Sequence, residues 1–273
     1  MYNFTDLHLH TTHSWDAEQT IESLIKKAYK EDVEFLGLTE HLDFHNNHPE
    51  SFMHLDYNKY TAAVEHAKKD FPGLIKGVEV GEPNIYTELY DKYMEGKHFD
   101  FIMASVHWIN GATPVFEEYF KRYKSYDDAY KKYFEEEFKL VSYGNFDAVA
   151  HLTLVHRHGK KLYKEYTYEK YKKEIDDILK VIISKNLALE VNCSGLRHPA
   201  KELIPDEDVI KAYIALGGNS IFIGSDAHRL SDSFYGLKEG YETLDRLGVK
   251  EIVIFEKRKQ VRIPLRDDDI EGL

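Results

Sequence analysis

The sequence predicts an α/β barrel of the TIM type, built from seven strand-then-helix units. Short apolar segments alternate with longer amphipathic segments along the chain, and strands separated by helices pair in parallel through crossover connections. The 273 residues contain no internal repeat and no Pro-, Gly- or Ser-rich linker, so we expect residues 1–273 to form one domain. The alternative is a doubly wound open sheet, but no Gly-rich phosphate loop follows the first strand.

The first half of the chain supplies four of the expected strands. A helix follows the first strand, with Thr20 as its N-cap and apolar residues at helical spacing. A polar loop and a helix over residues 57–69 follow the second strand, and Pro72-Gly73 ends that helix. The four strands expected here are residues 4–9, 35–39, 74–80 and 101–106.

The second half repeats the same alternation. Its strands are expected at residues 146–150, 187–191, 221–224 and 251–255. Its helices are expected at residues 126–141, 168–184, 206–216 and 237–247. Gly217-Gly218 provides a C-terminal stop for the third of these helices. The tyrosine-rich stretch 126–143 predicts amphipathic packing, and an exposed aromatic face there would suit a subunit contact in a homo-oligomer.

Charge and cysteine content narrow the class of function. The net charge is −12 and the longest basic run is residues 257–259, which argues against electrostatic nucleic-acid binding. No run of eighteen apolar residues predicts a membrane helix, and the N-terminus lacks a signal-peptide pattern. The single cysteine, Cys193, excludes an intrachain disulfide and is expected to be a small buried residue. We therefore expect a cytoplasmic protein.

A His-x-His pair lies in the first predicted strand. In a regular strand Asp6, His8 and His10 share one face, with alternate residues roughly 6.5 Å apart. Leu7 and Leu9 are then expected to face a packed layer on the other side. A pair of this spacing arises by chance in a chain with fifteen histidines. The second such pair, His156 and His158, is expected in a loop, and five further histidines are expected at the surface: His45, His48, His54, His66 and His98.

More informative is where the metal-type residues fall along the chain. Each lies at or just after the carboxyl end of a predicted strand: His8, His10, His41, Glu79, His107, His151, Asp226 and His228. Parallel strands of a barrel place these ends at one rim, where barrel enzymes carry their active sites. Imidazole and carboxylate ligands without cysteine suit Zn, Mn or Fe. So many candidates predict two to three divalent ions, which in such clusters activate a bridging hydroxide and clamp a phosphoryl group.

The chain resembles the PHP (polymerase and histidinol phosphatase) superfamily. The resemblance is carried by residues 6–11 (DLHLHT), 39–41 (TEH), 77–79 (GVE), 105–107 (SVH), 150–151 (AH) and 224–228 (GSDAH). Residues 190–197 (EVNCSGLR) and the tail 253–259 resemble the stand-alone histidinol-phosphate phosphatases more narrowly. The resemblance implies a distorted (β/α)7 barrel with a trinuclear metal site at its carboxyl rim.

The resemblance also implies a distribution of ligands. One metal would be held by His8, His10, Glu79 and Asp226. A second would be held by Glu79, His107 and His151, and a third by Asp16, His41 and His228. Asp16 is preferred to His13 because the family's ligand in this loop lies six residues after the second histidine of the pair. Asp226 and His228 would act in catalysis through the metal-bound hydroxide.

Four further residues are candidates for substrate binding or support. Arg197 and Arg157 follow strands six and five on the rim side, where a guanidinium can bind phosphate oxygens bidentately; surface ion pairs are the alternative. Glu82 would bind the substrate's ammonium group or be solvated. Asp6 would support the ligands from the second shell or cap the barrel floor.

The resemblance implies a metal-dependent phosphomonoesterase that hydrolyses the small substrate L-histidinol phosphate to L-histidinol and phosphate, a step of histidine biosynthesis. The alternatives are a PHP-type enzyme acting on nucleotides or oligonucleotide ends, an amidohydrolase-like barrel, and a metal-binding barrel without turnover. An amidohydrolase is expected to carry a lysine after strand four, where this chain has His107. We expect neither nucleic acid nor membrane as a partner.

Overall fold

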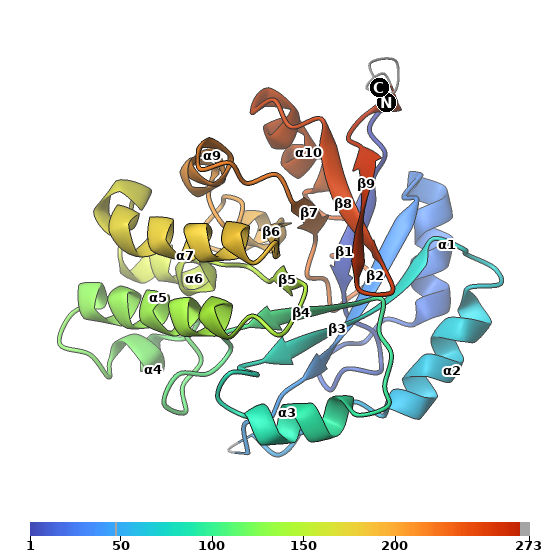
Figure 1. Ribbon diagram of the computed structural model, residues 1–273, viewed down its shortest axis with the longest axis horizontal. Helices are drawn as coiled ribbons and strands as arrows, with labels where there is room; N and C mark the ends of the chain where they lie inside the picture. The colour runs from blue at the N-terminus through green and yellow to red at the C-terminus, as the bar shows by residue number, and fades with distance from the viewer. Residues whose placement is uncertain (47, 268–273) are drawn as a thin grey trace.

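The expected barrel is present in the computed structural model, which describes residues 1–46 and 48–267 (Figure 1). Seven parallel strands form one sheet in the order of the sequence. A bridge between Leu9 and Ala227 joins β1 to the segment after β7 and nearly closes the barrel. The strands are β1 Thr5–Leu9, β2 Phe35–Leu42, β3 Leu74–Gly81, β4 Phe101–Ser105, β5 Ala148–Val149, β6 Ala188–Asn192 and β7 Ile221–Gly224.

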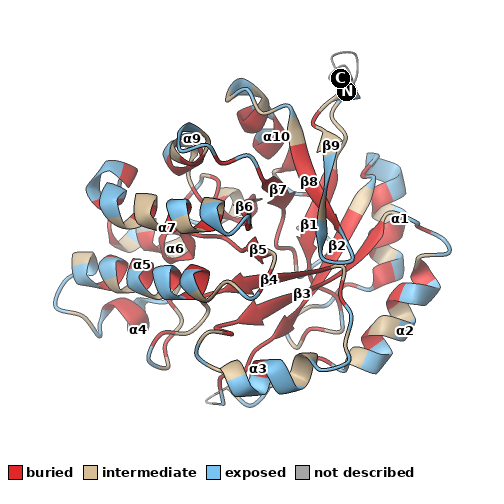
Figure 2. Ribbon diagram, viewed as in Figure 1, coloured by how far each residue is buried: buried red, intermediate tan, exposed pale blue. Residues whose placement is uncertain are grey.

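Helices surround the sheet and turn their apolar faces toward it, so that burial alternates along each helix (Figure 2). The helices are α1 Ile21–Glu31, α2 Tyr57–Ala67, α3 Thr87–Met94, α4 Glu117–Phe120, α5 Tyr126–Tyr143, α6 Leu154–Leu162, α7 Lys172–Ser184, α8 Ser194–Arg197, α9 Glu207–Ala215 and α10 Leu237–Arg246, with a 3-10 turn η1 at Tyr168–Tyr171. Thr20 caps α1 as predicted, and Cys193 is buried. None of these helices within the described ranges is long and apolar enough to span a membrane.

The chain departs from the sequence prediction in several elements. β2 continues three residues further than expected, so Glu40 and His41 belong to the strand itself. β5 has only two residues, which distorts the barrel. Helices α3 and α6 were not expected. His156 and His158 lie in α6, and the prediction of a loop there is wrong: this helix has only nine residues and carries Gly159, a poor helix former, in its interior.

A β-bulge changes the faces of β1. The pairing of β1 with β2 shifts register between Asp6 and Leu9, which breaks the strict alternation of a regular strand. Leu7 therefore belongs to the apolar cluster inside the barrel, whereas Leu9 belongs to the core between strands and helices. The prediction that both leucines pack into one layer is wrong for this reason.

The amino-terminal end of the barrel is closed by an antiparallel hairpin of β8 (Glu251–Glu256) and β9 (Lys259–Pro264). The Phe255 ring stacks on Phe101 with centroids 4.6 Å apart and meets the edge of Phe222 at 5.9 Å. Arg258 of the turn pairs with Asp147 next to β5. The predicted strand 251–255 is thus present but lies outside the barrel, and β9 was missed because its residues are mostly polar and partly exposed.

Candidate metal centre

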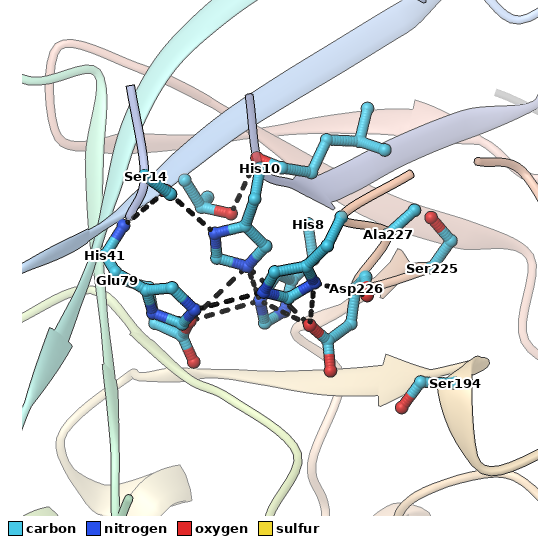
Figure 3. Close-up of polar contacts among 12 residues, drawn as sticks. His8, His10, Ser14, His41, Glu79, Ser194, Ser225, Asp226 and Ala227 are labelled. Atoms are coloured by element: carbon cyan, nitrogen blue, oxygen red, sulfur yellow. Dashed lines mark hydrogen bonds and ion pairs between the residues drawn. The ribbon is translucent and has the colours of Figure 1, made fainter. Parts of the chain in front are cut away.

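The nine residues expected as metal ligands all gather at the carboxyl rim of the barrel. Six of them are buried, and three are partly exposed at the mouth: Asp16, His107 and His228. Most of the nine line a cavity of about 850 Å³. Figure 3 shows His8, His10, His41, Glu79 and Asp226 pointing toward one another from the carboxyl ends of β1, β2 and β3 and from the segment after β7.

His8 on β1 and His10 just after it face Asp226, which follows the neighbouring strand β7 across the seam of the barrel. Nε2 of His8 and Nε2 of His10 lie 3.0 Å apart, and each lies 3.6 Å from Oδ1 of Asp226. Gly224 makes this approach possible, because a Cβ there would lie 2.3 Å from Cβ of His8. Asp226 itself has φ 54°, in the left-handed region. Backbone strain of this kind is concentrated at functional sites.

Glu79 occupies the middle of the site. Its Oε1 lies 2.9 Å from Nε2 of His151 and 3.2 Å from Nε2 of His107. Its Oε2 lies 3.1 Å from Nδ1 of His41 and 3.4 Å from Nε2 of His8. A carboxylate with imidazole nitrogens around both oxygens has the arrangement of a ligand shared between two cations.

The third group of candidate ligands consists of His41 on β2, Asp16 in the loop after β1 and His228 in the loop after β7. Nε2 of His41 lies 3.2 Å from Nε2 of His228. Oδ2 of Asp16 lies 3.6 Å from the first of these nitrogens and 3.4 Å from the second. His13, the rejected alternative, lies instead against the ring of Tyr60, with centroids 5.5 Å apart.

The donor set fits divalent metal ions. Among the described residues, Oε2 of Glu79 and Nδ1 of His41 are buried side-chain atoms without a hydrogen-bond partner, although they face each other. Burial would raise the pKa of Glu79, but His107 and His8 hold it well below its usual value. Burial and the neighbouring His41 lower the pKa of His10. Zn, Mn and Fe take ionised carboxylates and neutral imidazoles as ligands. Although burial opposes it, Glu190 and Glu79 raise the pKa of His8, so an ion bound there would take the place of its proton.

The ligand groups overlap, which indicates two to three ions. In the part of the chain that the structure describes, four sets of three side chains bring their ligand atoms within 4.8 Å of one another. These sets are His8–His10–Asp226, His8–Glu79–His151, His10–His41–His228 and His41–Asp43–His107. Because His8, His10 and His41 each belong to two sets, one ion could not satisfy all of them.

Glu190 was missed by the sequence reasoning. It lies on β6, is fully buried, and its Oε1 accepts a hydrogen bond from Nδ1 of His8 at 2.7 Å. Its Oε2 accepts from the backbone N–H of His151 at 2.6 Å, and Asn192 donates to Oε1. A carboxylate behind a metal-ligating imidazole fixes its orientation and tautomer. A charged residue within an apolar strand was the signal that could have found it.

Asp43 and Glu40 were missed as well. Asp43 Oδ1 lies 3.1 Å from Nδ1 of His107, and so supports that ring from behind. Glu40 accepts hydrogen bonds from the hydroxyls of Thr11 and Ser14. Ser14 lies 3.4 Å from Nδ1 of His10, so this chain of hydrogen bonds reaches a ligand candidate. Glu40 precedes His41 within β2, and Asp43 directly follows this strand, which the prediction ended too early.

Arg157 and Arg197 both reach the cavity and both hold Asp226. Nη1 of Arg157 donates to Oδ2 of Asp226 at 2.5 Å and to Oγ of Ser194 at 3.2 Å. Arg197 donates to the backbone carbonyls of Ser225 and Asp226, each at 2.6 Å. The two guanidinium groups therefore approach the metal centre together, from α6 and α8.

Two other expected residues have different surroundings from those predicted. Glu82 is buried rather than solvated, and one of its oxygens accepts from the backbone N–H groups of His107 and Trp108. It is absent from the described residues that line the cavity, so its geometry supports the position of His107 and not contact with a substrate. Asp6 accepts from the backbone N–H of Ser225 at 2.8 Å, and so holds β1 to the segment that carries Asp226.

An aromatic wall forms the side of the cavity opposite the arginines. It consists of Trp15, His48, Trp108 and Phe116, with His45 behind it. The ring of His45 stacks on Trp108, with centroids 4.7 Å apart and an interplanar angle of 6°. The prediction that His45 is a surface residue is wrong, because it is buried against Trp108, whereas His48 is half-buried beside Trp15 and Trp108. His54, His66 and His98 are exposed as expected.

Comparisons with known proteins agree with this geometry. The family model described as PHP domain matches residues 6–194. A probable histidinol-phosphatase of Clostridium acetobutylicum is 27% identical over 93% of this chain and 97% of its own length. A histidinol-phosphatase of Lactococcus lactis is 25% identical over 93% of this chain and 95% of its own length.

A solved structure has the same fold. The crystal structure of histidinol phosphate phosphatase from Lactococcus lactis, complexed with zinc, L-histidinol and phosphate, aligns with a TM-score of 0.86 at 23% identity. The alignment covers 95% of this chain and 99% of that chain. The likeness therefore extends over the whole barrel.

Proposed function

The chain belongs to the PHP domain family, and from this premise we propose that it is a metal-dependent phosphomonoesterase that hydrolyses L-histidinol phosphate to L-histidinol and phosphate. Relatives named histidinol-phosphatase match nearly their full length. The observation that carries the proposal is the meeting of Arg157 and Arg197 with the imidazole and carboxylate cluster in one cavity. Two guanidinium groups beside a cluster of metal ligands suit a phosphoryl group.

The ligand assignment is part of the proposal. His8, His10, Glu79 and Asp226 would hold one ion, Glu79, His107 and His151 a second, and Asp16, His41 and His228 a third. When bound, such ions polarise the phosphoryl oxygens and lower the pKa of coordinated water, which supplies the nucleophile.

The protein's own residues orient the reacting group. Arg157 and Arg197 present N–H donors at the mouth of the cavity, and charge that develops on phosphoryl oxygens during displacement attracts them. In forming those bonds the Arg157 guanidinium must share or release Oδ2 of Asp226. Glu190 and Asp43 hold the rings of His8 and His107 in fixed orientations, so little reorganisation is needed during the reaction.

The organic part of the substrate has a matching surface. Histidinol phosphate carries an imidazole and an ammonium group. The wall of Trp15, Trp108 and Phe116 offers flat apolar faces on which a planar cationic ring can stack. The carboxylate of Asp232, at the edge of the same cavity, is available to an ammonium group.

The proposal places the enzyme in the cytoplasm, where a soluble amino-acid precursor would be its substrate. Residues 1–273 act as one catalytic domain in this proposal. A homo-oligomer remains part of the prediction: on α5, Tyr126 and Phe138 are exposed, while the other aromatic residues are largely buried.

Steady-state kinetics test the function directly. The purified protein, supplied with Zn or Mn, is assayed on histidinol phosphate, AMP and a short 3′-phosphorylated oligonucleotide. We expect kcat/KM for histidinol phosphate to exceed the other two at least tenfold and to fall to background after chelation. Equal or better turnover of a nucleotide substrate, or full activity after chelation, would overturn the proposal.

A further inference from the structure

The second His-x-His pair, His156 and His158, lies on α6 and is not used by the metal centre. The His156 side chain is buried, and both of its ring nitrogens have partners. Nδ1 lies 2.9 Å from the hydroxyl of Tyr130, and Nε2 lies 2.8 Å from Oε1 of Glu202. An ionised carboxylate can only accept, so Nε2–H of His156 donates to Glu202, and Nδ1 shares the second hydrogen bond with the Tyr130 hydroxyl.

The partners of His156 come from separate segments. Tyr130 is on α5, and Glu202 lies between α8 and α9. Tyr166, which precedes η1, stacks on the imidazole with centroids 4.0 Å apart. The hydroxyl of Tyr166 then donates to Oδ2 of Asp206, the N-cap of α9, at 2.8 Å. His156 therefore ties α5, α6 and the α8–α9 segment together.

Each of the last two segments carries one of the cavity arginines. Arg157 follows His156 on α6 and donates to the side chain of Asp226. Arg197 ends α8 and donates to the backbone carbonyl of Asp226. The segments also touch through the backbone, because the N–H of Ala200 donates to the carbonyl of Arg157 at 3.1 Å. The position of one guanidinium relative to the other thus depends on how these segments are joined.

We propose that His156, with Tyr130 and Glu202, is a positioning residue that sets the spacing of Arg157 and Arg197 for the phosphoryl group. This inference rests on the proposed function for the identity of the anion. Two guanidinium groups bind one phosphoryl group well only when their forks are correctly placed, and small displacements weaken binding and rate. His156 touches neither substrate nor metal ligand, so it acts through the two arginines.

Simple packing is the rival explanation. Stacking on Tyr166 would by itself account for burial of the ring, and any aromatic residue could then replace His156. The two explanations differ at the hydrogen bonds, because packing alone needs neither the Tyr130 hydroxyl nor the Glu202 carboxylate. Substitutions that keep the ring and remove the hydrogen bonds therefore separate them.

The experiment compares Tyr130→Phe, His156→Phe and His156→Gln in zinc-loaded protein. The readouts are KM and kcat for histidinol phosphate, the dissociation constant of inorganic phosphate by calorimetry, and zinc content. We expect Tyr130→Phe and His156→Phe to weaken phosphate binding and to raise KM about five- to tenfold, the effect of losing one or two buried hydrogen bonds. Zinc content should be unchanged, kcat should change less than KM, and His156→Gln should recover part of the loss.

Tyr213→Phe is the matched control. The Tyr213 hydroxyl is also buried and hydrogen-bonded, but to the backbone of Ser220 at the opposite end of the barrel. If phosphate affinity changes no more in Tyr130→Phe than in Tyr213→Phe, or if zinc is lost in parallel, the positioning role is overturned. Should His156→Phe not fold, Tyr130→Phe still decides the matter.

The wild-type measurements separate this inference from the proposed function. Wild-type protein that binds phosphate but does not turn over histidinol phosphate overturns the proposed substrate, and the variants still test the positioning role through phosphate affinity. Wild-type protein that binds no phosphate overturns the positioning role itself, because the two arginines would then have another use.

Discussion

The two ends of the barrel are built from the same seven strands but are filled in opposite ways. At the amino end, Phe101, Phe222 and Phe255 stack beneath the β8–β9 hairpin and exclude polar groups. At the carboxyl end, imidazoles and carboxylates are equally buried, and Glu79 meets four histidines within 3.4 Å. The barrel interior is filled by apolar packing at the amino end, whereas the carboxyl end leaves buried ligand atoms directed at a common centre.

The comparison separates stability from function. Apolar rings stabilise the barrel through burial and need no ion. Buried carboxylates and imidazoles oppose folding unless each is paired or coordinates a metal. The buried ligands at the carboxyl rim therefore lower the stability of the fold in exchange for a metal site. We expect substitutions at the rim to change metal content and activity, and substitutions at the amino end to change the free energy of unfolding.

The largest effect is expected from removing a ligand at the rim. Asp226→Ala deletes a carboxylate that faces both His8 and His10, so it should lower metal content and reduce kcat/KM at least about a thousandfold. The circular dichroism spectrum should stay that of a folded barrel. Asp208→Ala, on the exposed side of α9, is the control and should retain metal and activity. Wild-type metal content in Asp226→Ala would remove this residue from the ligand set.

A substitution at the amino end should have the opposite result, a loss of stability without a loss of metal. Phe255→Ala removes a ring that packs against Phe101 and Phe222, and it should lower the free energy of unfolding by about 3–5 kcal/mol. Metal content and kcat of the folded fraction should remain within about twofold of the wild type. Denaturant unfolding and metal analysis measure the two quantities. A Phe255→Ala protein that is stable but loses metal would show that the two ends are coupled.

A smaller effect on metal binding is expected from Glu190, which lies behind the expected ligand His8. Glu190→Gln keeps the shape of the side chain that accepts from Nδ1 of His8 but removes its charge. We expect metal affinity, measured by competition with a chromogenic chelator, to fall about 10- to 100-fold. Glu65→Gln, on the exposed face of α2, should leave the affinity unchanged. An unaltered affinity in Glu190→Gln would reduce this carboxylate to a packing role.

The smallest effect concerns Glu137, a buried carboxyl on α5 without an imidazole partner among the described contacts. Burial raises its pKa to about 8, the opposite of Glu79. The folded protein then keeps this proton up to about pH 8, whereas the unfolded chain releases it near pH 4.5. Stability should therefore fall as the pH rises from about 5 to 8.

Glu137→Gln should lose less stability over that interval. We expect its Tm to exceed that of the wild type by more at pH 8 than at pH 5, because only the wild-type carboxyl has to lose a buried proton over that interval. Thermal melts at both pH values measure this. A Tm difference that is the same at both would show that Glu137 is not titrating in this range.

Features of the fold and of the metal centre could be predicted from the sequence where they depend on the periodicity of apolar residues. The fold and eight of the nine expected ligands follow from apolar segments and the polar residues at their carboxyl ends, because parallel strands bring those ends together, whereas Asp16 was expected only from the family resemblance. Glu190 and Asp43 were missed because their function depends on which imidazole lies across the barrel, and register decides that. The face of Leu7 depended on a bulge, and the stacking of His45 on Trp108 joins two loops whose conformation has no periodic signal.

The bridge between Leu9 and Ala227 has a consequence for how the protein is made. The barrel meets itself at this seam, where Asp6 bonds to Ser225 although the two are 219 positions apart. A ribosome that has synthesised the chain through β6 has already produced His8, Glu79 and His151 but not Asp226 or His228. Because chains emerge and fold from the amino terminus, the ligand set stays incomplete until nearly the whole protein has been translated. Metal uptake thus reports completion of the barrel, and nascent fragments should not compete for the cell's supply of the ion with the same affinity.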